Sequence, residues 1–305
     1  MKRSLSSLLI MLLFACAAFA QNPQKAESCR STVTGQLDIF PFTSKVFENT
    51  RNLRIWLPPG YSDPANAGRR YPVLYMLDGQ NLFDECTGFG HQEWKVDEKL
   101  TRMIAEGKIP PLIVVGIDNA GAKRAYEYLP YRDNVQQPAM EEVAGKRFPE
   151  FLGSEVLPWI DAHYRTKTGP ENTAIGGSSY GGIAALWALL MREDLFSMGI
   201  VESPVLLIGN AQLVRDTKPL PYGPAKVFLA TGGSESEMPA ANVMEVELVK
   251  MLAENLRNAM LRHTEVMLVV EEKAKHNESA WGNRFPAAIE FLFGGKEQKS
   301  LSLKQ

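Results

Sequence analysis

One short stretch constrains this chain more than any other. An apolar run stops at glycines and serines, and a helix-forming run begins directly after them: positions 173–182 read TAIGGSSYGG, followed at once by IAALWALL. This pattern is typical of a strand that turns sharply into a helix, with Ser179 at the tip of the turn. Gly177 and Gly181 stand two positions before and after the serine, where a strained turn leaves no room for a Cβ atom. The Gly-x-Ser-x-Gly spacing therefore predicts a nucleophile elbow.

A simpler interpretation of the same turn is that Ser178 or Ser179 only caps the helix, by accepting a hydrogen bond from its first N–H groups. The bare motif alone is also a weak signal, because it should arise by chance in roughly one chain in ten of this length. We favour a nucleophile, because the positive end of the helix dipole would stabilise an oxyanion formed next to Ser179.

From residue 73 onward, short apolar runs alternate with runs of helical length. We expect strands at 73–77 and 112–117, a strand that leads into the elbow, and strands at 199–202, 227–231 and 266–270. Helices are expected at 94–105, 148–164, 183–191, 243–262 and 280–293. Two alternating stretches before them, 36–40 and 52–57, predict an antiparallel hairpin. Such an order predicts an α/β fold with a mostly parallel central sheet, an antiparallel N-terminal hairpin and helices on both faces.

The start of the chain has the features of a secretory signal peptide. Residues 1–20 begin with Met-Lys-Arg, continue with an apolar stretch and end in Ala-Phe-Ala. We therefore expect an exported protein, periplasmic or secreted, with an N-terminal tail at 21–32, one large α/β domain at 33–293 and a polar tail at 294–305. The alternative is a lipoprotein signal in which Cys16 becomes the lipidated first residue, which would attach the protein to a membrane.

Composition narrows the classes of partner. Lys and Arg together number 33 against 35 for Asp and Glu, so nothing favours nucleic acid or an anionic membrane surface. Cys29 and Cys86 are the two cysteines beyond the predicted signal peptide, and in an exported protein they could form a disulfide. No spacing of cysteine and histidine suggests a metal site, and we predict neither a metal nor an organic cofactor.

A serine nucleophile needs a base, and the chain has four histidines. His163 and His263 are expected at helix ends, where imidazole can cap free carbonyl groups, and His91 lies in a loop. His276 follows the strand predicted at 266–270. Ligands of open α/β sheets bind at the carboxyl ends of the strands, so His276 is the predicted general base.

An acid that orients the histidine should lie between the serine and the histidine, because this type of fold supplies them in the order Ser, acid, His. The strand predicted at 227–231 is followed by GGSESE at 232–237. We expect Glu235 to be the acid because it is nearer the strand end, with Glu237 as the alternative. Either one could instead be an ordinary solvated carboxylate.

Three blocks of sequence resemble one known family. YMLDGQNLFD at 75–84, GSSYGG at 177–182, and HNE at 276–278 with Trp281 after it are similar to the putative esterase family of α/β-hydrolases. This family includes esterase D, siderophore esterases, feruloyl and acetylxylan esterases, and mycolyltransferases. The resemblance covers most of residues 35–293 and is strongest to the siderophore-esterase-like and feruloyl-esterase-like group. It implies an α/β-hydrolase fold and carboxylic ester hydrolysis.

The resemblance also implies roles for single residues. Ser179 would be the nucleophile and His276 the base, while Glu235 matches the acidic position only loosely. The backbone N–H groups of Gln80 and Tyr180 would form the oxyanion hole. A tight turn after a strand is the alternative interpretation of the loop that contains Gln80.

The sequence also contains candidates for contacts with the substrate. Phe83, Trp94 and Trp281 could contact substrate, although such aromatic side chains are more often part of the core. Lys123 and Arg124 could meet an anionic or catecholate substrate, or could be a solvated basic pair.

We therefore expect an exported serine carboxylic ester hydrolase that forms an acyl-enzyme. Its partner would be a small-molecule or carbohydrate ester, such as a siderophore lactone or a feruloylated or acetylated sugar. One alternative is an acyltransferase with the same chemistry, in which an alcohol replaces water. The other is a binding protein that keeps the α/β-hydrolase fold without catalysis.

Overall fold

The computed structural model describes residues 29–133, 142–219, 223–260 and 263–295. The predicted signal peptide, Cys16 and most of both predicted tails lie outside these residues. From Ser31 onward the chain forms one compact unit. Within the described ranges, no helix combines the length and apolar character needed to cross a membrane. Cys29 and Cys86 are both disulfide-bonded.

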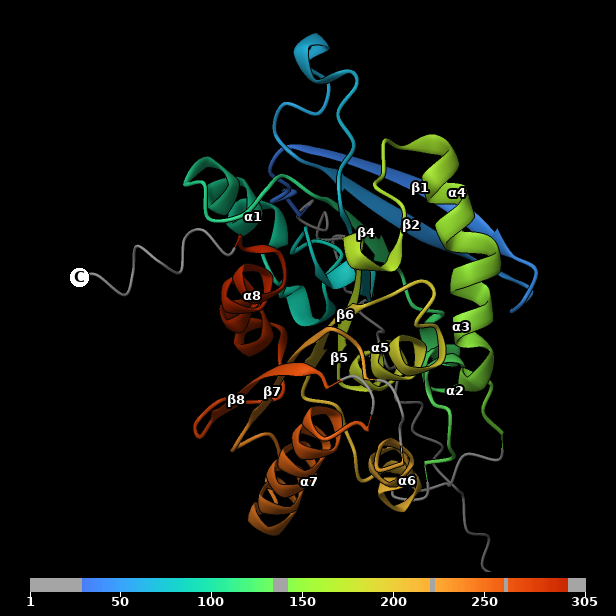
Figure 1. Cartoon of the computed structure of the whole chain (residues 1–305), viewed down its shortest axis with the longest axis vertical. Helices are drawn as coiled ribbons and strands as arrows, with labels where there is room; N and C mark the ends of the chain where they lie inside the picture. Colours follow the sequence, from blue (N-terminus) through green and yellow to red (C-terminus); the bar gives the residue numbers. More distant parts are fainter. Residues whose placement is uncertain (1–28, 134–141, 220–222, 261–262, 296–305) are drawn as a thin grey trace, which may run out of the picture. The chain divides into compact units, whose positions relative to one another are not determined.

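The described strands form one sheet in the order β1-β2-β4-β3-β5-β6-β7-β8 (Figure 1). β1 pairs antiparallel with β2, and β2 with β4, whereas every other neighbouring pair is parallel. This arrangement confirms the predicted mostly parallel sheet with an antiparallel N-terminal hairpin. The strands are β1 (Gln36–Ser44), β2 (Asn49–Leu57), β3 (Val73–Leu77), β4 (Ile113–Ile117), β5 (Thr173–Ser178), β6 (Met198–Glu202), β7 (Lys226–Gly232) and β8 (Glu265–Glu271).

The α-helices connect these strands. They are α1 (Val96–Ala105), α2 (Arg124–Tyr128), α3 (Phe148–Phe151), α4 (Leu157–His163), α5 (Tyr180–Met191), α6 (Ile208–Thr217), α7 (Pro239–Arg257) and α8 (Glu278–Phe293). A π-helical turn, Leu152–Val156, joins α3 to α4, so the helix predicted at 148–164 is nearly continuous.

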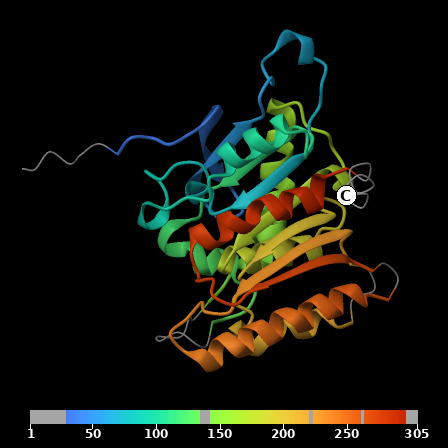
Figure 2. The same ribbon diagram turned by 90° about the vertical axis from the view of Figure 1, so that its left-hand side faces the viewer.

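Helices cover both faces of the sheet, as the sequence predicts. Val73, Tyr75 and Leu77 of β3 face the cluster formed with α3, α4, α5, α6 and α7. Leu74 and Met76, the alternate residues, face the cluster formed with α1 and α8, because successive side chains of a strand point to opposite faces. Figure 2 shows α8 lying across the strands on the second face, beside α1.

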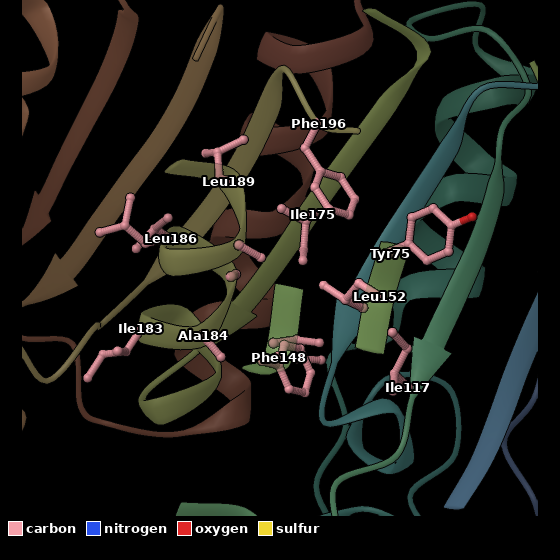
Figure 3. Packing of buried hydrophobic residues seen from close by; sticks show 14 of the residues in the cluster. Tyr75, Ile117, Phe148, Leu152, Ile175, Ile183, Ala184, Leu186, Leu189 and Phe196 are labelled. Carbon is pink, nitrogen blue, oxygen red and sulfur yellow. The ribbon is translucent and has the colours of Figure 1, made fainter. Parts of the chain in front are cut away.

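The larger cluster is built around the helix that follows the elbow. Ile175 of β5 and Leu186 of α5 are completely buried, as is Phe196 just before β6. Figure 3 shows these side chains packed together with Tyr75 and Phe148. Each side chain of this size contributes about 1.5–3 kcal/mol when fully buried, so the elbow is anchored on both sides by tightly packed elements.

The strand order sets the position of the site. β3 lies between β4 and β5, so the chain winds away from β3 in both directions. Crevices for ligands form at such a switch point, at the carboxyl ends of the strands. The turn Gly79–Asn81 follows β3, and Ser179 follows β5. The topology therefore brings the predicted oxyanion loop and the predicted nucleophile to the same edge of the sheet.

Two helices, the short α2 and α6, have no counterpart among those predicted from the sequence. Near its start, α6 has three residues at positive φ, namely Gly209, Asn210 and Ala211. A left-handed start interrupts the periodicity by which a helix is identified in a sequence. α7 also begins earlier than expected, at Pro239, because proline is well suited to the first turn of a helix.

Candidate active site

Ser179 has a strained backbone. Its φ of 58° and ψ of −129° lie outside the regions that a serine ordinarily adopts, at a cost of about 1–3 kcal/mol. Its backbone N–H donates to the carbonyl of Glu202 in β6 at 3.0 Å, which helps to hold this geometry. The serine side chain does not cap α5, so the interpretation as a capping serine does not describe the turn.

The glycines around Ser179 are required by close backbone contacts. A Cβ atom on Gly177 would lie 2.6 Å from the carbonyl oxygen of Gly181. A Cβ atom on Gly181 would lie 2.8 Å from Oδ2 of Asp78. Both distances are shorter than real contacts of a Cβ atom, so the spacing of the motif has the steric origin expected from the sequence.

His276 lies in the loop between β8 and α8 and contacts Glu235. The His276 Nδ1 and the Glu235 Oε2 are 3.0 Å apart, while Glu237, the alternative acid, is exposed. The ring of His276 also meets Trp281 edge-on, with centroids 4.9 Å apart. A carboxylate at Nδ1 favours the tautomer that leaves Nε2 free to accept a proton.

Three hydrogen bonds hold Glu235 in its charged form. Burial raises the pKa of Glu235, but hydrogen bonds from His276, Ser203 and the backbone N–H of Gly232 more than offset it, so this pKa lies below its ordinary value. The Gly232 N–H donates to Oε1 at 2.6 Å, and the Ser203 hydroxyl donates to the same oxygen. Trp281 Nε1 in turn donates to the Ser203 hydroxyl at 2.8 Å.

Ser179 and His276 line the same cleft, which has a volume of about 380 Å³. Pockets of this size suit small organic ligands. Gln80, in the turn after β3, also lines the cleft, and Tyr180 is the first residue of α5, directly after the serine. Further lining residues are Asp78, Asn81, Phe89, Gly90, Gln92, Asn119, Arg124, Ser178, Asn277, Glu278 and Trp281.

Of the three aromatic residues expected to contact substrate, two lie elsewhere. Phe83 and Trp94 are only 1% and 2% exposed and pack in the core beneath α1 and α8. Their positions correspond to the alternative interpretation of such aromatic residues as core packing. Trp281 does line the cleft, where it contacts both His276 and Ser203.

An ion pair under the cleft joins the predicted oxyanion loop to the elbow. Arg124 Nε and Nη2 donate to the two carboxylate oxygens of Asp78, each at 2.7 Å. Asn119 Nδ2 donates to Asp78 as well, at 2.7 Å. The guanidinium group of Arg124 lies over the ring of Tyr180, 5.4 Å from its centroid. Arg124 is therefore not a solvated basic residue, whereas its neighbour Lys123 is exposed.

Sequence reasoning missed the role of two buried carboxylates of the cleft. Asp78 is 4% exposed with a left-handed φ of 57°. Glu278 is 7% exposed and accepts a hydrogen bond from Asn81 Nδ2 at 3.1 Å, and burial raises its pKa. Both residues stand in the blocks that carry the family resemblance, but nothing in their spacing indicates a partner.

The remaining histidines lie away from the cleft. His163 ends α4, and its Nδ1 contacts the carbonyl of Trp159 at 2.7 Å, which confirms the expected position at a helix end. His263 is not at a helix end as expected, because α7 already ends at Arg257, and it is exposed just before β8. His91 is exposed in the loop before α1. Neither is among the residues that line the cleft.

One known protein family matches most of the chain. Residues 44–292 match the family model described as Putative esterase. The chain belongs to the putative esterase family. The family is one of esterases, and the chain is an enzyme of the carboxylic ester hydrolase class.

Individual relatives are distant. The uncharacterized protein YbbA of Bacillus subtilis (strain 168) is 23% identical over 256 residues, covering 80% of this chain and 93% of that protein. The endo-1,4-beta-xylanase/feruloyl esterase of Xylanibacter ruminicola is 25% identical over 211 residues, covering 66% of this chain but only 25% of that longer protein. The crystal structure of the enterobactin esterase from Shigella flexneri superposes with a TM-score of 0.66 at 17% identity, covering 87% of this chain and 60% of that one.

Proposed function

We propose that the protein is a serine carboxylic ester hydrolase with Ser179 as nucleophile, His276 as general base and Glu235 as the acid that orients the histidine. The contact of 3.0 Å between Glu235 and His276, in a loop that lines a cleft together with Ser179, is the observation that carries this proposal. The same chain order of serine, acid and histidine is found throughout α/β-hydrolases.

The reaction proceeds in two steps. His276 Nε2 takes the hydroxyl proton as Ser179 Oγ attacks the ester carbonyl, and the alcohol leaves with that proton. Water then attacks the acyl-enzyme with the same assistance and frees the acid. The backbone N–H groups of Gln80 and Tyr180 hold the oxyanion in both steps, and one such donor typically contributes about 3 kcal/mol to transition-state stabilisation.

The lining of the cleft favours an uncharged ester that can form hydrogen bonds. Amide side chains are frequent along it, and Asp78 already neutralises the charge of Arg124. Phe89 and Trp281 add aromatic surface. We propose a siderophore lactone or a feruloylated or acetylated carbohydrate as the substrate, in line with the distant similarity to an enterobactin esterase and to a feruloyl esterase.

Export is part of the proposal and rests on residues 1–20. Cleavage by signal peptidase predicts a mature chain that begins at Gln21. The mass of the protein recovered from the periplasm or medium of an expressing bacterium tests this. A diacylated chain that begins at Cys16 would replace the proposed secreted form with a lipoprotein.

Hydrolysis of a panel of esters tests the proposed reaction. The panel contains p-nitrophenyl esters of graded acyl length, methyl ferulate, an acetylated sugar and a catecholate trilactone. We expect the wild-type protein to hydrolyse at least one of them and Ser179→Ala to lose activity by about 10³-fold or more. Products formed with added sugar or glycerol distinguish hydrolysis from acyl transfer. Equal activity of wild type and variant would contradict the proposed nucleophile.

A further inference from the structure

Three acidic side chains gather at the start of α1, away from the catalytic cleft. One carboxylate oxygen from each of Glu93, Asp97 and Glu98 lies within 4.8 Å of the other two. Glu93 is 5% exposed and Asp97 is fully buried. Carboxylates this close and this well shielded from water repel one another strongly unless something positive lies between them.

Each of the three carboxylates also keeps an oxygen that the protein does not satisfy. In the described part of the chain, Glu93 Oε2, Asp97 Oδ1 and Glu98 Oε2 are buried and receive no hydrogen bond. The other oxygens of the two most buried groups are fixed by the segment before β1. Thr32 Oγ1 donates to Glu93 Oε1 at 2.7 Å, and the Thr34 N–H donates to Asp97 Oδ2 at 2.5 Å.

The lysines close by in sequence form their direct contacts elsewhere. Lys99 donates to the backbone carbonyl of Trp94, and Lys95 pairs with Glu85 at 3.5 Å. Among the described residues, no lysine, arginine or histidine forms an ion pair with Glu93, Asp97 or Glu98. Lys95 attracts Glu93, and Lys99 attracts Glu93 and Glu98, but no direct contact with a cationic side chain that the structure describes balances the charge of the three carboxylates.

We propose that Glu93, Asp97 and Glu98 bind a divalent cation, with Ca²⁺ as the preferred ion. Hard cations take carboxylate oxygens as ligands. Ca²⁺ accepts irregular sets of six to eight oxygen ligands, whereas Mg²⁺ demands nearly ideal octahedral geometry, so three carboxylates from one short segment suit the larger ion better. Thr101, one helical turn after Asp97, has a buried hydroxyl oxygen without a partner, and water would complete the coordination.

The cation would fix three segments to one another. Thr32 Oγ1 contacts Glu93 and also accepts from the backbone N–H of Glu85 at 3.0 Å. It therefore links the segment before β1, the start of α1 and the loop at 84–92. Phe89, Gly90 and Gln92 of this loop line the catalytic cleft. Ion binding would accordingly stabilise the fold and one wall of the cleft without taking part in the chemistry.

Thermal unfolding of the full chain with and without cation tests the site. After treatment with EDTA and dialysis, we expect millimolar Ca²⁺ to raise the Tm of the wild type by about 3 °C or more, as ligand linkage predicts. Mg²⁺ should have a smaller effect. Equilibrium dialysis should find one Ca²⁺ per chain, with a Kd of about 10⁻⁴–10⁻³ M, the range of extracellular calcium modules.

Matched variants assign the ion to this cluster. Asp97→Asn can still accept from Thr34, and Glu98→Gln changes a less buried group, so one remains informative if the other does not fold. Each should weaken Ca²⁺ binding at least tenfold and remove most of the Tm increase. Glu85→Gln removes a neighbouring carboxylate that is 41% exposed. This control should retain both the Ca²⁺ affinity and the Tm increase of the wild type.

Two results would overturn the assignment. Absence of any Ca²⁺ or Mg²⁺ effect on the wild type would mean that the three carboxylates share protons instead of an ion. Unchanged binding in both Asp97→Asn and Glu98→Gln would place the ion elsewhere.

Discussion

At the scale of single residues, Glu235 determines how the proposed triad works. It receives hydrogen bonds from Gly232 and Ser203 on one oxygen and contacts His276 with the other. These donors keep its pKa below the ordinary value despite burial. The carboxylate therefore remains charged at neutral pH, where it can stabilise the imidazolium that forms when His276 accepts a proton.

Replacing this charge should remove most of the activity while leaving the fold intact. We expect Glu235→Gln to lower kcat by about 10²–10⁴-fold, because a neutral amide stabilises imidazolium poorly and permits the wrong tautomer of His276. Glu237→Gln is the matched control, since Glu237 is exposed two residues further on, and it should stay within about twofold of wild type. Steady-state kinetics on the ester that the wild type hydrolyses fastest measures kcat for both variants. Equal losses in the two variants would contradict the assignment of Glu235.

Another prediction at this scale concerns the ion pair of Asp78 and Arg124. Their side chains are 6% and 26% exposed, so Arg124→Ala leaves a buried carboxylate without its main partner. We expect the free energy of unfolding to fall by about 3 kcal/mol, while Lys123→Ala, at an exposed position, changes it by less than about 0.5 kcal/mol. Urea titration measures both, and similar values for the two variants would show that the ion pair contributes little.

At the scale of elements, the turn between β5 and α5 is limited by backbone contacts. A methyl group on Gly177 would meet the carbonyl of Gly181 at 2.6 Å, and a backbone atom cannot move aside as a flexible side chain can. We expect Gly177→Ala to destabilise the protein by about 2–3 kcal/mol. Gly68→Ala is the control, because a Cβ atom there meets nothing within 4 Å. Thermal unfolding of both variants measures the difference, and an unchanged Tm for Gly177→Ala would argue against a constrained elbow.

The sequence predicts the elements well where local pattern determines them. β3 matches its predicted range, and a strand leads into the elbow as predicted, because buried parallel strands are short, apolar and bounded by glycine or loop residues. α6 is missed because its first turn is left-handed. Phe83 and Trp94 lie in the core rather than along the cleft; a sequence cannot show which face of a loop or helix meets solvent before the packing is known.

The side chains of the candidate site divide in the same way. Ser179 and His276 are predicted from their positions after strands, which follow from topology. The pairing of Asp78 with Arg124 is not, because their contact spans 46 residues and depends on how two loops fold. The carboxylate cluster around Asp97 is missed for a similar reason: the spacings used to look for a metal site concern cysteine and histidine.

At the scale of the whole molecule, two buried carboxyl groups predict how stability varies with pH. Burial raises the pKa of Glu202 and of Glu245 from 4.5 to about 7, although Arg284 and the Leu206 N–H respectively act in the opposite direction. Between pH 4.5 and about 7, these two groups hold more protons in the folded chain than in the unfolded chain. The contribution of these two groups to the free energy of unfolding should therefore decrease as the pH rises from 4.5 to about 7.

Glu245→Gln tests this dependence. The amide can still accept from the Leu206 N–H, which donates to Glu245 at 2.7 Å, but it does not titrate. In wild type, titration of Glu245 lowers the free energy of unfolding by up to about 1.4 kcal/mol per pH unit, and the variant should lack this contribution. The variant should therefore lose less stability than wild type between about pH 5 and about pH 7. Urea unfolding at a series of pH values measures both slopes. Identical slopes would mean that Glu245 does not titrate in this range.

Acylation of Ser179 is the central step of the proposed reaction, and covalent labelling tests it most directly. The full chain is treated with a fluorophosphonate, digested, and searched for the modified peptide by tandem mass spectrometry while ester hydrolysis is followed in parallel. We predict a single adduct on Ser179 whose extent equals the fraction of activity lost. Activity that survives complete labelling, or an adduct on another residue such as Ser203, would contradict the proposed mechanism.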